Sequence, residues 1–126
     1  MKFTLFLITF CFYSFSYSQL LINEYSASNM NTVNDAYGDK EDWVELYNTT
    51  AAAVDLTGWY LSDRSGNPLK WTFPASNINA NDHKLIFCSG RDIDQGGELH
   101  TNFTLRQTEG DWVILSTLLG NVVESF

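Results

Sequence analysis

The stretch from Glu41 to Asp63, EDWVELYNTTAAAVDLTGWYLSD, decides the fold of this chain. In its first half, Val44 and Leu46 fall on one side of an extended strand. Trp43, Glu45 and Tyr47 fall on the other side. This alternation predicts a half-buried β-strand. The Asn-Thr-Thr at 48–50 then interrupts the strand, because Asn and Thr side chains bond their own backbone and initiate turns.

The second half of the stretch predicts further short strands. The run 51–56 is apolar except for Asp55, and it ends at Thr57 and Gly58. Because glycine has no side chain, the backbone can turn sharply at Gly58, and a new strand is expected from Trp59 to Leu61. The stretch therefore reads as consecutive strands of an all-β domain.

Four segments of the chain resemble the lamin-tail domain in their order and spacing. They are WVELYNTT at 43–50, VDLTGWYLSD at 54–63, WTFPASNI at 71–78 and KLIFCSG at 84–90. The resemblance extends from about Leu20 to Phe126 and implies an immunoglobulin-like β-sandwich. It also implies a bacterial-type secreted member, since the family occurs in nuclear lamins and, in bacteria, in secreted or surface proteins beside other domains. The family has no shared active site, so the resemblance implies no catalytic residue.

Strand and turn signals continue along the rest of the chain. Strands are expected at Leu20–Ser26, Leu69–Phe73, His83–Cys88, Trp112–Ser116 and Val122–Ser125, with a short edge segment around Ile78. Loops or turns are expected at Ser28–Tyr37, Ser89–Leu99 and Glu109–Asp111. Short strands divided by Gly, Asn, Asp and Pro are typical of a sandwich or barrel. The chain ends inside a strand-like run, so we expect a domain over 19–126 that lacks its last strand.

Residues 1–18 have the pattern of a secretory signal peptide. Lys2 supplies the positive start, the following apolar stretch is too short for a comfortable membrane span, and Ser16 and Ser18 are small residues at the positions that signal peptidase reads. Cleavage before Gln19 is predicted. We therefore expect a secreted or cell-surface protein without membrane insertion after cleavage. An uncleaved anchor is the weaker alternative, because serines interrupt the end of the apolar run.

The charge of the chain argues against several classes of partner. The formal net charge is −8. Nucleic acid and anionic lipid are bound chiefly by neutralising phosphates, and the sequence shows no basic stripe for that purpose. No nucleic-acid partner is expected.

The sequence contains no recognisable catalytic motif. Cys11 leaves with the signal peptide, so Cys88 is alone in the mature chain and is expected to be a small buried hydrophobe. His83 and Cys88 fall on opposite faces of their strand, which argues against zinc. No Gly-x-Ser-x-Gly elbow and no phosphate-binding glycine loop is present. We therefore expect no enzymatic activity and no cofactor.

The acidic residues just before the strand predicted at 43–47 form the one candidate metal site. They are Asp35, Asp39, Glu41 and Asp42, with Glu24 and Glu45 as neighbours that the fold could bring close. Carboxylate-rich loops suit calcium, although the spacing here is not that of an EF-hand. The favoured interpretation is a solvated acidic loop, and calcium binding is the alternative.

Aromatic residues form a second group that could bind a ligand. They are Trp43, Tyr47, Trp59, Trp71 and Trp112. Aromatic faces stack on sugars or anchor a partner, but their bulk favours burial, so we expect most of them in the core or half-buried. Glu45 shares a strand face with two of them. If that face is buried, Glu45 must be paired or hydrogen-bonded.

Together these features favour a non-catalytic, exported interaction, adhesion or scaffolding module of a larger secreted or cell-surface protein, with a protein or glycan partner. The alternative is a carbohydrate-binding accessory module of a secreted hydrolase or nuclease whose catalytic part lies outside this chain. An exposed planar row of Trp side chains would favour sugar binding. An exposed apolar patch or an open edge strand would favour a protein partner.

Overall fold

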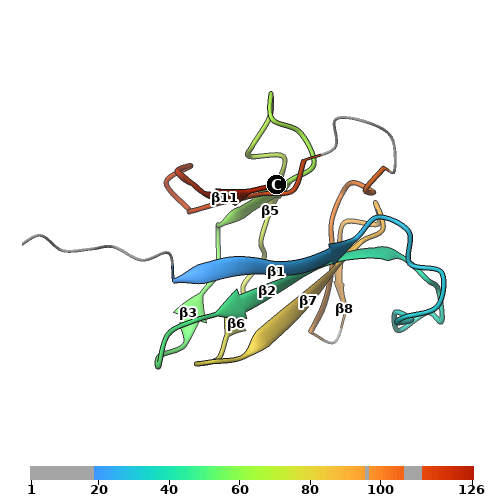
Figure 1. The fold of residues 1–126 in the computed structure, drawn as a ribbon, viewed down its shortest axis with the longest axis horizontal. Coiled ribbons are helices and arrows are strands. Elements are labelled where there is room, and N and C mark those ends of the chain that lie inside the picture. Colours follow the sequence, from blue (N-terminus) through green and yellow to red (C-terminus); the bar gives the residue numbers. More distant parts are fainter. Residues whose placement is uncertain (1–18, 96, 107–111) are drawn as a thin grey trace, which may run out of the picture.

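The computed structural model describes residues 19–95, 97–106 and 112–126, which form eleven strands and no helix (Figure 1). The strands are β1 (Leu20–Ser26), β2 (Asp42–Asn48), β3 (Val54–Asp55), β4 (Tyr60–Ser62), β5 (Trp71–Thr72), β6 (Asn77–Ile78), β7 (His83–Cys88), β8 (Ile93–Gln95), β9 (Glu98–His100), β10 (Ile114–Ser116) and β11 (Val122–Ser125). Strands β1, β2, β7 and β11 lie where the sequence predicted strands. The predicted segments 69–73 and 112–116 contain the shorter β5 and β10.

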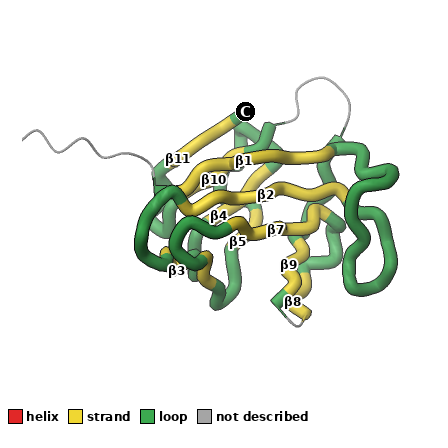
Figure 2. The backbone as a smooth tube through the Cα atoms, turned by 60° about the horizontal axis from the view of Figure 1, so that its bottom comes forward, coloured by secondary structure: helices red, strands yellow, loops and turns green. Residues whose placement is uncertain are grey.

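The strands form two main sheets. One has five strands in the order β1-β2-β7-β9-β8, and the other has four in the order β11-β10-β4-β5. Strands β3 and β6 form a separate small pair. Figures 1 and 2 show the two larger sheets as separate layers, and the predicted immunoglobulin-like β-sandwich is confirmed.

Strand β2 lies inside the five-stranded sheet and pairs on both edges. It is antiparallel to β1 on one side and to β7 on the other, with Val44 opposite both Tyr25 and Ile86. Val44 and Leu46 are fully buried in the core, as the alternation predicted. The other sheet contributes buried apolar residues that complete this core, namely Leu61, Trp71 and Leu115.

The turn after β2 depends on the buried side chain of Asn48. Its Nδ2 donates to the carbonyls of Ala52 at 2.8 Å and Asn79 at 2.9 Å, and its Oδ1 accepts from the Thr50 N–H at 3.0 Å. The sequence analysis predicted such local bonding, but not the contact with the turn before β7. Further on, Gly58 has φ of +79°, so the sharp turn predicted there is confirmed.

The prediction of a loop over Ser89–Leu99 is wrong. This segment contains β8 and the first part of β9, which pair antiparallel with each other. Strand β9 also pairs in parallel with β7, Ile86 opposite Leu99. The three-residue strands are stable here because they extend an existing sheet, which a local pattern does not reveal. A Gly-Gly pair between them is itself a hairpin signal, and Gly97 has φ of +88°.

Two predictions fall outside the described residues. The signal peptide at 1–18 and the turn at 109–111 are not described, so they stay predictions. Within the part of the chain that is described, no helix is long and apolar enough to cross a membrane.

Truncating the core side chain of β2 should destabilise the domain. Leu46→Ala removes a side chain with 0 % exposure and leaves a cavity between the sheets, which typically costs about 2–5 kcal/mol. Leu119→Ala, at a side chain that is 80 % exposed, is the matched control and should change little. Urea unfolding measures both free energies. A Leu46→Ala protein as stable as the control would contradict the assignment of β2 to the core.

Candidate functional site

Asp35 organises the loop 27–41, which connects β1 to β2. Its side chain is buried, and its Oδ1 accepts hydrogen bonds from the backbone N–H groups of Tyr37 at 3.0 Å and Asp39 at 2.8 Å. The backbone closes the same turn, because Asp35 N–H donates to the Asp39 carbonyl and Gly38 N–H donates to the Asp35 carbonyl. The loop is therefore built around one carboxylate.

Arg91, which follows β7, binds this loop through its side chain. Its guanidinium forms ion pairs with Asp35 and Asp39, and a third with Glu41 at 3.3 Å. The guanidinium also lies over the Tyr37 ring, 4.6 Å from its centroid. The expectation of a solvated acidic loop is thus wrong for Asp35, whose side chain is buried and paired. The reason is a cation that lies 56 residues further along the chain.

These contacts determine the acidity of Asp35. Burial by itself raises the pKa of its carboxyl group. Hydrogen bonds from the Asp39 backbone, the Arg91 side chain and the Tyr37 backbone outweigh burial, so the pKa lies below the ordinary value of 3.8. The carboxylate is therefore held in its charged form.

Three other predicted acidic residues lie apart from this cluster. Asp42 begins β2 and is half-buried, and burial raises its pKa against an opposing hydrogen bond from the Asn29 backbone. Glu24 and Glu45 face each other across β1 and β2. Glu45 is half-buried and accepts a hydrogen bond from Asn23 Nδ2 at 2.7 Å.

The acidic cluster has the donor atoms of a cation site. Oxygens of Asp35, Asp39 and Glu41 all lie within 4.8 Å of one another, and carboxylate oxygens suit calcium. Arg91 already pairs with all three carboxylates, so calcium would have to compete with its guanidinium. The arrangement is that of an internal ion-pair network.

His100, which the sequence analysis did not select, is the centre of a second network. Its Nδ1 is 2.9 Å from Ser89 Oγ and its Nε2 is 2.9 Å from Glu98 Oε1. Glu98 Oε1 also accepts the Ala36 N–H at 2.8 Å, and Ser89 Oγ accepts the Arg91 N–H at 3.2 Å. The network therefore ties the loop 27–41 and the chain after β7 to strand β9. The only sequence signal is the period-two spacing of Glu98 and His100.

A hydroxyl, an imidazole and a carboxylate in contact are also the groups of nucleophilic catalysis. Here the His100 side chain has 0 % exposure, and its ring stacks on Phe87 with a centroid distance of 5.4 Å. His100 borders a cavity of about 110 Å³, but Ser89 does not line that cavity. The geometry supports a structural role for this network. Cys88 is also buried, and burial raises the pKa of its thiol, which confirms the expected inert residue.

Four of the five aromatic residues are buried or half-buried, as expected. Trp43 and Trp71 are buried, and Trp59 is half-buried against the core. Tyr47 is half-buried and stacks on His83 with a centroid distance of 4.5 Å. Trp112 is the exception, with 41 % of its surface exposed. The described residues therefore contain no planar row of exposed Trp side chains.

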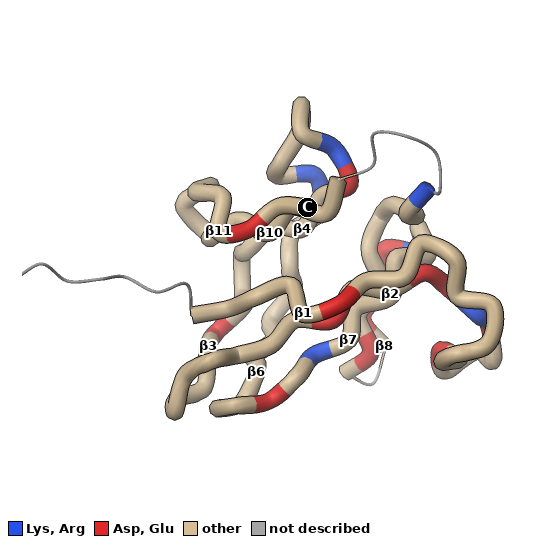
Figure 3. The backbone as a smooth tube through the Cα atoms, viewed as in Figure 1, with Lys and Arg blue, Asp and Glu red and all other residues tan. Residues whose placement is uncertain are grey.

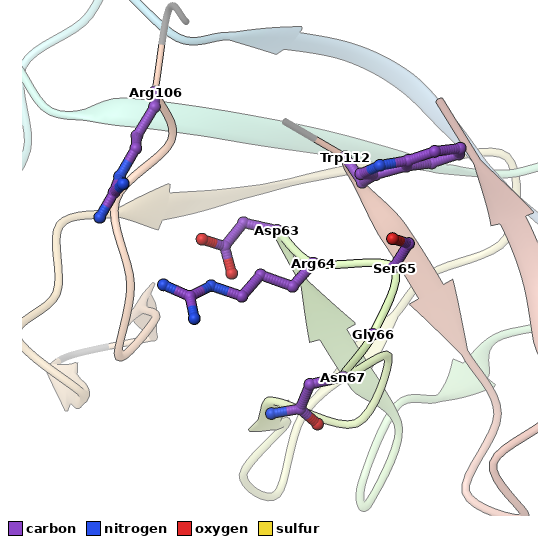
Figure 4. Close-up of a pocket in the computed structure, with 7 residues that line it drawn as sticks. All are labelled: Asp63, Arg64, Ser65, Gly66, Asn67, Arg106 and Trp112. Atoms are coloured by element: carbon purple, nitrogen blue, oxygen red, sulfur yellow. The ribbon is translucent and has the colours of Figure 1, made fainter. Parts of the chain in front are cut away.

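Trp112 borders a pocket of about 450 Å³ at one end of the sandwich (Figure 4). The loop 63–70 between β4 and β5 supplies one wall, including Arg64 and Asn67. Figure 4 shows Arg106 on one flank and Trp112 on the other, with the Arg64 side chain extended towards Arg106. The pocket thus combines guanidinium groups with one aromatic face.

Exposed apolar side chains gather at the turn between β10 and β11. Leu118, Leu119 and Val122 are 58 %, 80 % and 54 % exposed. Leu69 is also exposed, and its methyl groups lie 3.6 Å from the position that a Cβ on Gly120 would occupy. These four side chains, from 69, 118, 119 and 122, are called the apolar patch below. Large exposed apolar groups of this kind mark interaction sites.

The ion pair of Asp35 makes stability depend on pH. Because the folded-state pKa lies below 3.8, the carboxylate contributes stability above that pH, and the contribution is lost as pH falls through the folded-state pKa. We expect Asp35→Asn to unfold at lower urea than the wild type at neutral pH, with the difference shrinking in acid. Urea titrations across this range measure it. A difference that is constant with pH would contradict the role of the charge.

Calcium should not stabilise the wild-type protein, because the Arg91 guanidinium already pairs with all three carboxylates and calcium would have to displace it. Thermal unfolding with calcium and with chelator should give the same Tm, and Asp39→Asn should respond in the same way as the wild type. A wild type that loses stability in chelator, beside an Asp39→Asn variant that does not, would establish a calcium site in the loop 27–41.

Comparison with known proteins agrees with the fold. No curated protein matches the chain. The model of the Lamin Tail Domain family matches residues 14–126, which is most of the chain. This is an immunoglobulin-like domain family that is generally non-catalytic. The chain therefore belongs to the lamin tail domain family.

Proposed function

We propose that the chain is a non-catalytic, exported interaction module, serving adhesion or scaffolding within a larger secreted or cell-surface protein. The observation that carries the proposal is the apolar patch, which stands on a family fold used as a module. Export rests on the signal-peptide pattern of residues 1–18. The bacterial-type secreted character is part of the same proposal.

The partner at the apolar patch is a protein with an apolar ridge and a neutral or positive net charge. Binding removes the apolar surface of the patch from water, and this transfer stabilises the complex. A second copy of the chain is disfavoured, because two molecules that each carry a formal charge of −8 repel each other. A basic partner is instead attracted over the distance that ionic screening allows.

A glycan partner is the second candidate function, as a carbohydrate-binding accessory module of a secreted hydrolase or nuclease. Trp112 favours it, because an exposed indole beside a polar pocket can stack on a sugar ring. The other three Trp residues are buried or half-buried, so the wide aromatic platform expected for neutral glycans is missing from the described residues. We therefore place protein binding first.

The test uses the exported protein, whose mass should show cleavage before Gln19. Proteins of the producing cell's surface are captured on it, identified and purified, and the affinity of each for the wild type and two variants is measured by calorimetry. Leu119→Glu places a charge in the apolar patch and should weaken binding by about tenfold or more. Met30→Glu makes the same change at a side chain that is 72 % exposed in the loop 27–41, and should bind like the wild type.

Equal affinity of Leu119→Glu and the wild type for every purified partner would reject the apolar patch as the binding surface. Failure of every purified protein to bind would reject protein binding altogether. Thermal unfolding of both variants shows whether a loss of affinity comes from loss of the fold.

A further inference from the structure

The few basic residues of this acidic chain are unevenly distributed (Figure 3). Of the seven Lys and Arg residues, Lys2 lies outside the described residues, which leaves six. Three of these six, Arg64, Lys70 and Arg106, border two neighbouring cavities at one end of the sandwich. This gathering of positive charge on a chain with a net charge of −8 favours the approach of a negatively charged ligand at this place.

The two cavities adjoin, because Asp63, Arg64 and Arg106 line both of them. The larger is about 450 Å³ and is flanked by Trp112, and the smaller is about 260 Å³ and includes Lys70. The volume of the larger cavity is typical of sites for small ligands, and the smaller cavity extends it. The pair therefore offers room for more than one unit of a linear ligand.

The positive charge of this site is only partly neutralised. Asp63 is buried and pairs with Lys70, Nζ to Oδ1, at 2.7 Å, so these two charges cancel. Lys70 is further fixed above the Phe103 ring, 5.1 Å from its centroid. Arg64 and Arg106 form no ion pair with any residue that the structure describes. Among the described residues, nothing neutralises these two guanidinium groups, and both belong to exposed residues that an anion can reach.

We propose that this pocket binds an acidic saccharide, with Arg64 and Arg106 on its carboxylate or sulfate group and Trp112 against a sugar ring. The planar guanidinium fork matches the oxygens of a carboxylate or sulfate. The Asn67 amide and the Ser65 hydroxyl, which also line the pocket, supply hydrogen bonds for sugar hydroxyls. An acidic peptide fits less well, because the larger pocket offers no apolar recess for peptide side chains apart from the Trp112 face.

None of the four residues of the apolar patch lines either cavity, so substitutions in the pocket test this proposal apart from the proposed protein partner. Calorimetry of the mature protein with oligogalacturonate and with a heparin oligosaccharide distinguishes carboxylate from sulfate recognition. A neutral cello-oligosaccharide of the same length, polyglutamate and a short DNA strand are the comparison ligands. Binding of an acidic oligosaccharide is expected, and it should weaken as salt shortens the Debye length to about 8 Å at physiological ionic strength.

Three variants assign the binding to the pocket. Arg64→Gln combined with Arg106→Gln should weaken binding by about tenfold or more, because charge-assisted hydrogen bonds are lost. Trp112→Ala should weaken binding of the same ligand, because stacking is lost. Lys84→Ala removes a positive charge from β7, away from the pocket lining, and should bind like the wild type. Unchanged thermal unfolding confirms that each variant is folded.

Several results would overturn the proposal. They are no binding of either acidic oligosaccharide, equal binding of the neutral one, and equal affinity of the double arginine variant or of Trp112→Ala. Binding of polyglutamate as tight as that of the oligosaccharides would reassign the pocket to acidic peptides. DNA binding of that strength would reassign it to phosphate and would contradict the exclusion of nucleic acid.

Discussion

The structure depends on the enclosure of strand β2, which is hydrogen-bonded along both edges and has buried side chains on both faces. Its edges are hydrogen-bonded to β1 and β7, and Val44 and Leu46 fill the space between the sheets. The opposite face is also largely covered, with Trp43 buried beside Phe87 of β7. A strand enclosed in this way has one register, because a slip of one residue would place Glu45 in the core.

Polar contacts hold the loop 27–41 in its folded form beside the sheet. Asp35 closes the loop internally, while Arg91 and Glu98 hold it from the segments after β7. A buried carboxylate is stable only when it is paired and hydrogen-bonded, and both conditions are met here. Residues with the appearance of a metal site or a catalytic group thus serve to attach a long loop to the sheet.

Two surfaces remain after these structural roles are assigned, and they differ in chemistry. The apolar patch at the β10–β11 turn is suited to the desolvated contact of a protein partner. The pocket beside Trp112 has polar walls and two arginines without an ion pair among the described residues, which suit an anionic ligand. Both surfaces lie on connections between strands, where a sandwich can vary its sequence without disturbing its core.

Local sequence patterns by themselves determined the all-β class, as a sandwich or a barrel, the positions of β1, β2, β7 and β11, and the burial of Leu46 and Cys88, while the resemblance to the lamin-tail domain selected the sandwich. The reason is that period-two alternation and turn chemistry act over a few residues and are visible in the chain. The tertiary structure alone decided that β8 and β9 extend the sheet and that Arg91 meets Asp35. It also placed His100 in the network at the loop and gathered Arg64, Lys70 and Arg106 around one pocket. Each of these depends on residues far apart in sequence, whose approach is set by the pairing of strands and not by any local pattern.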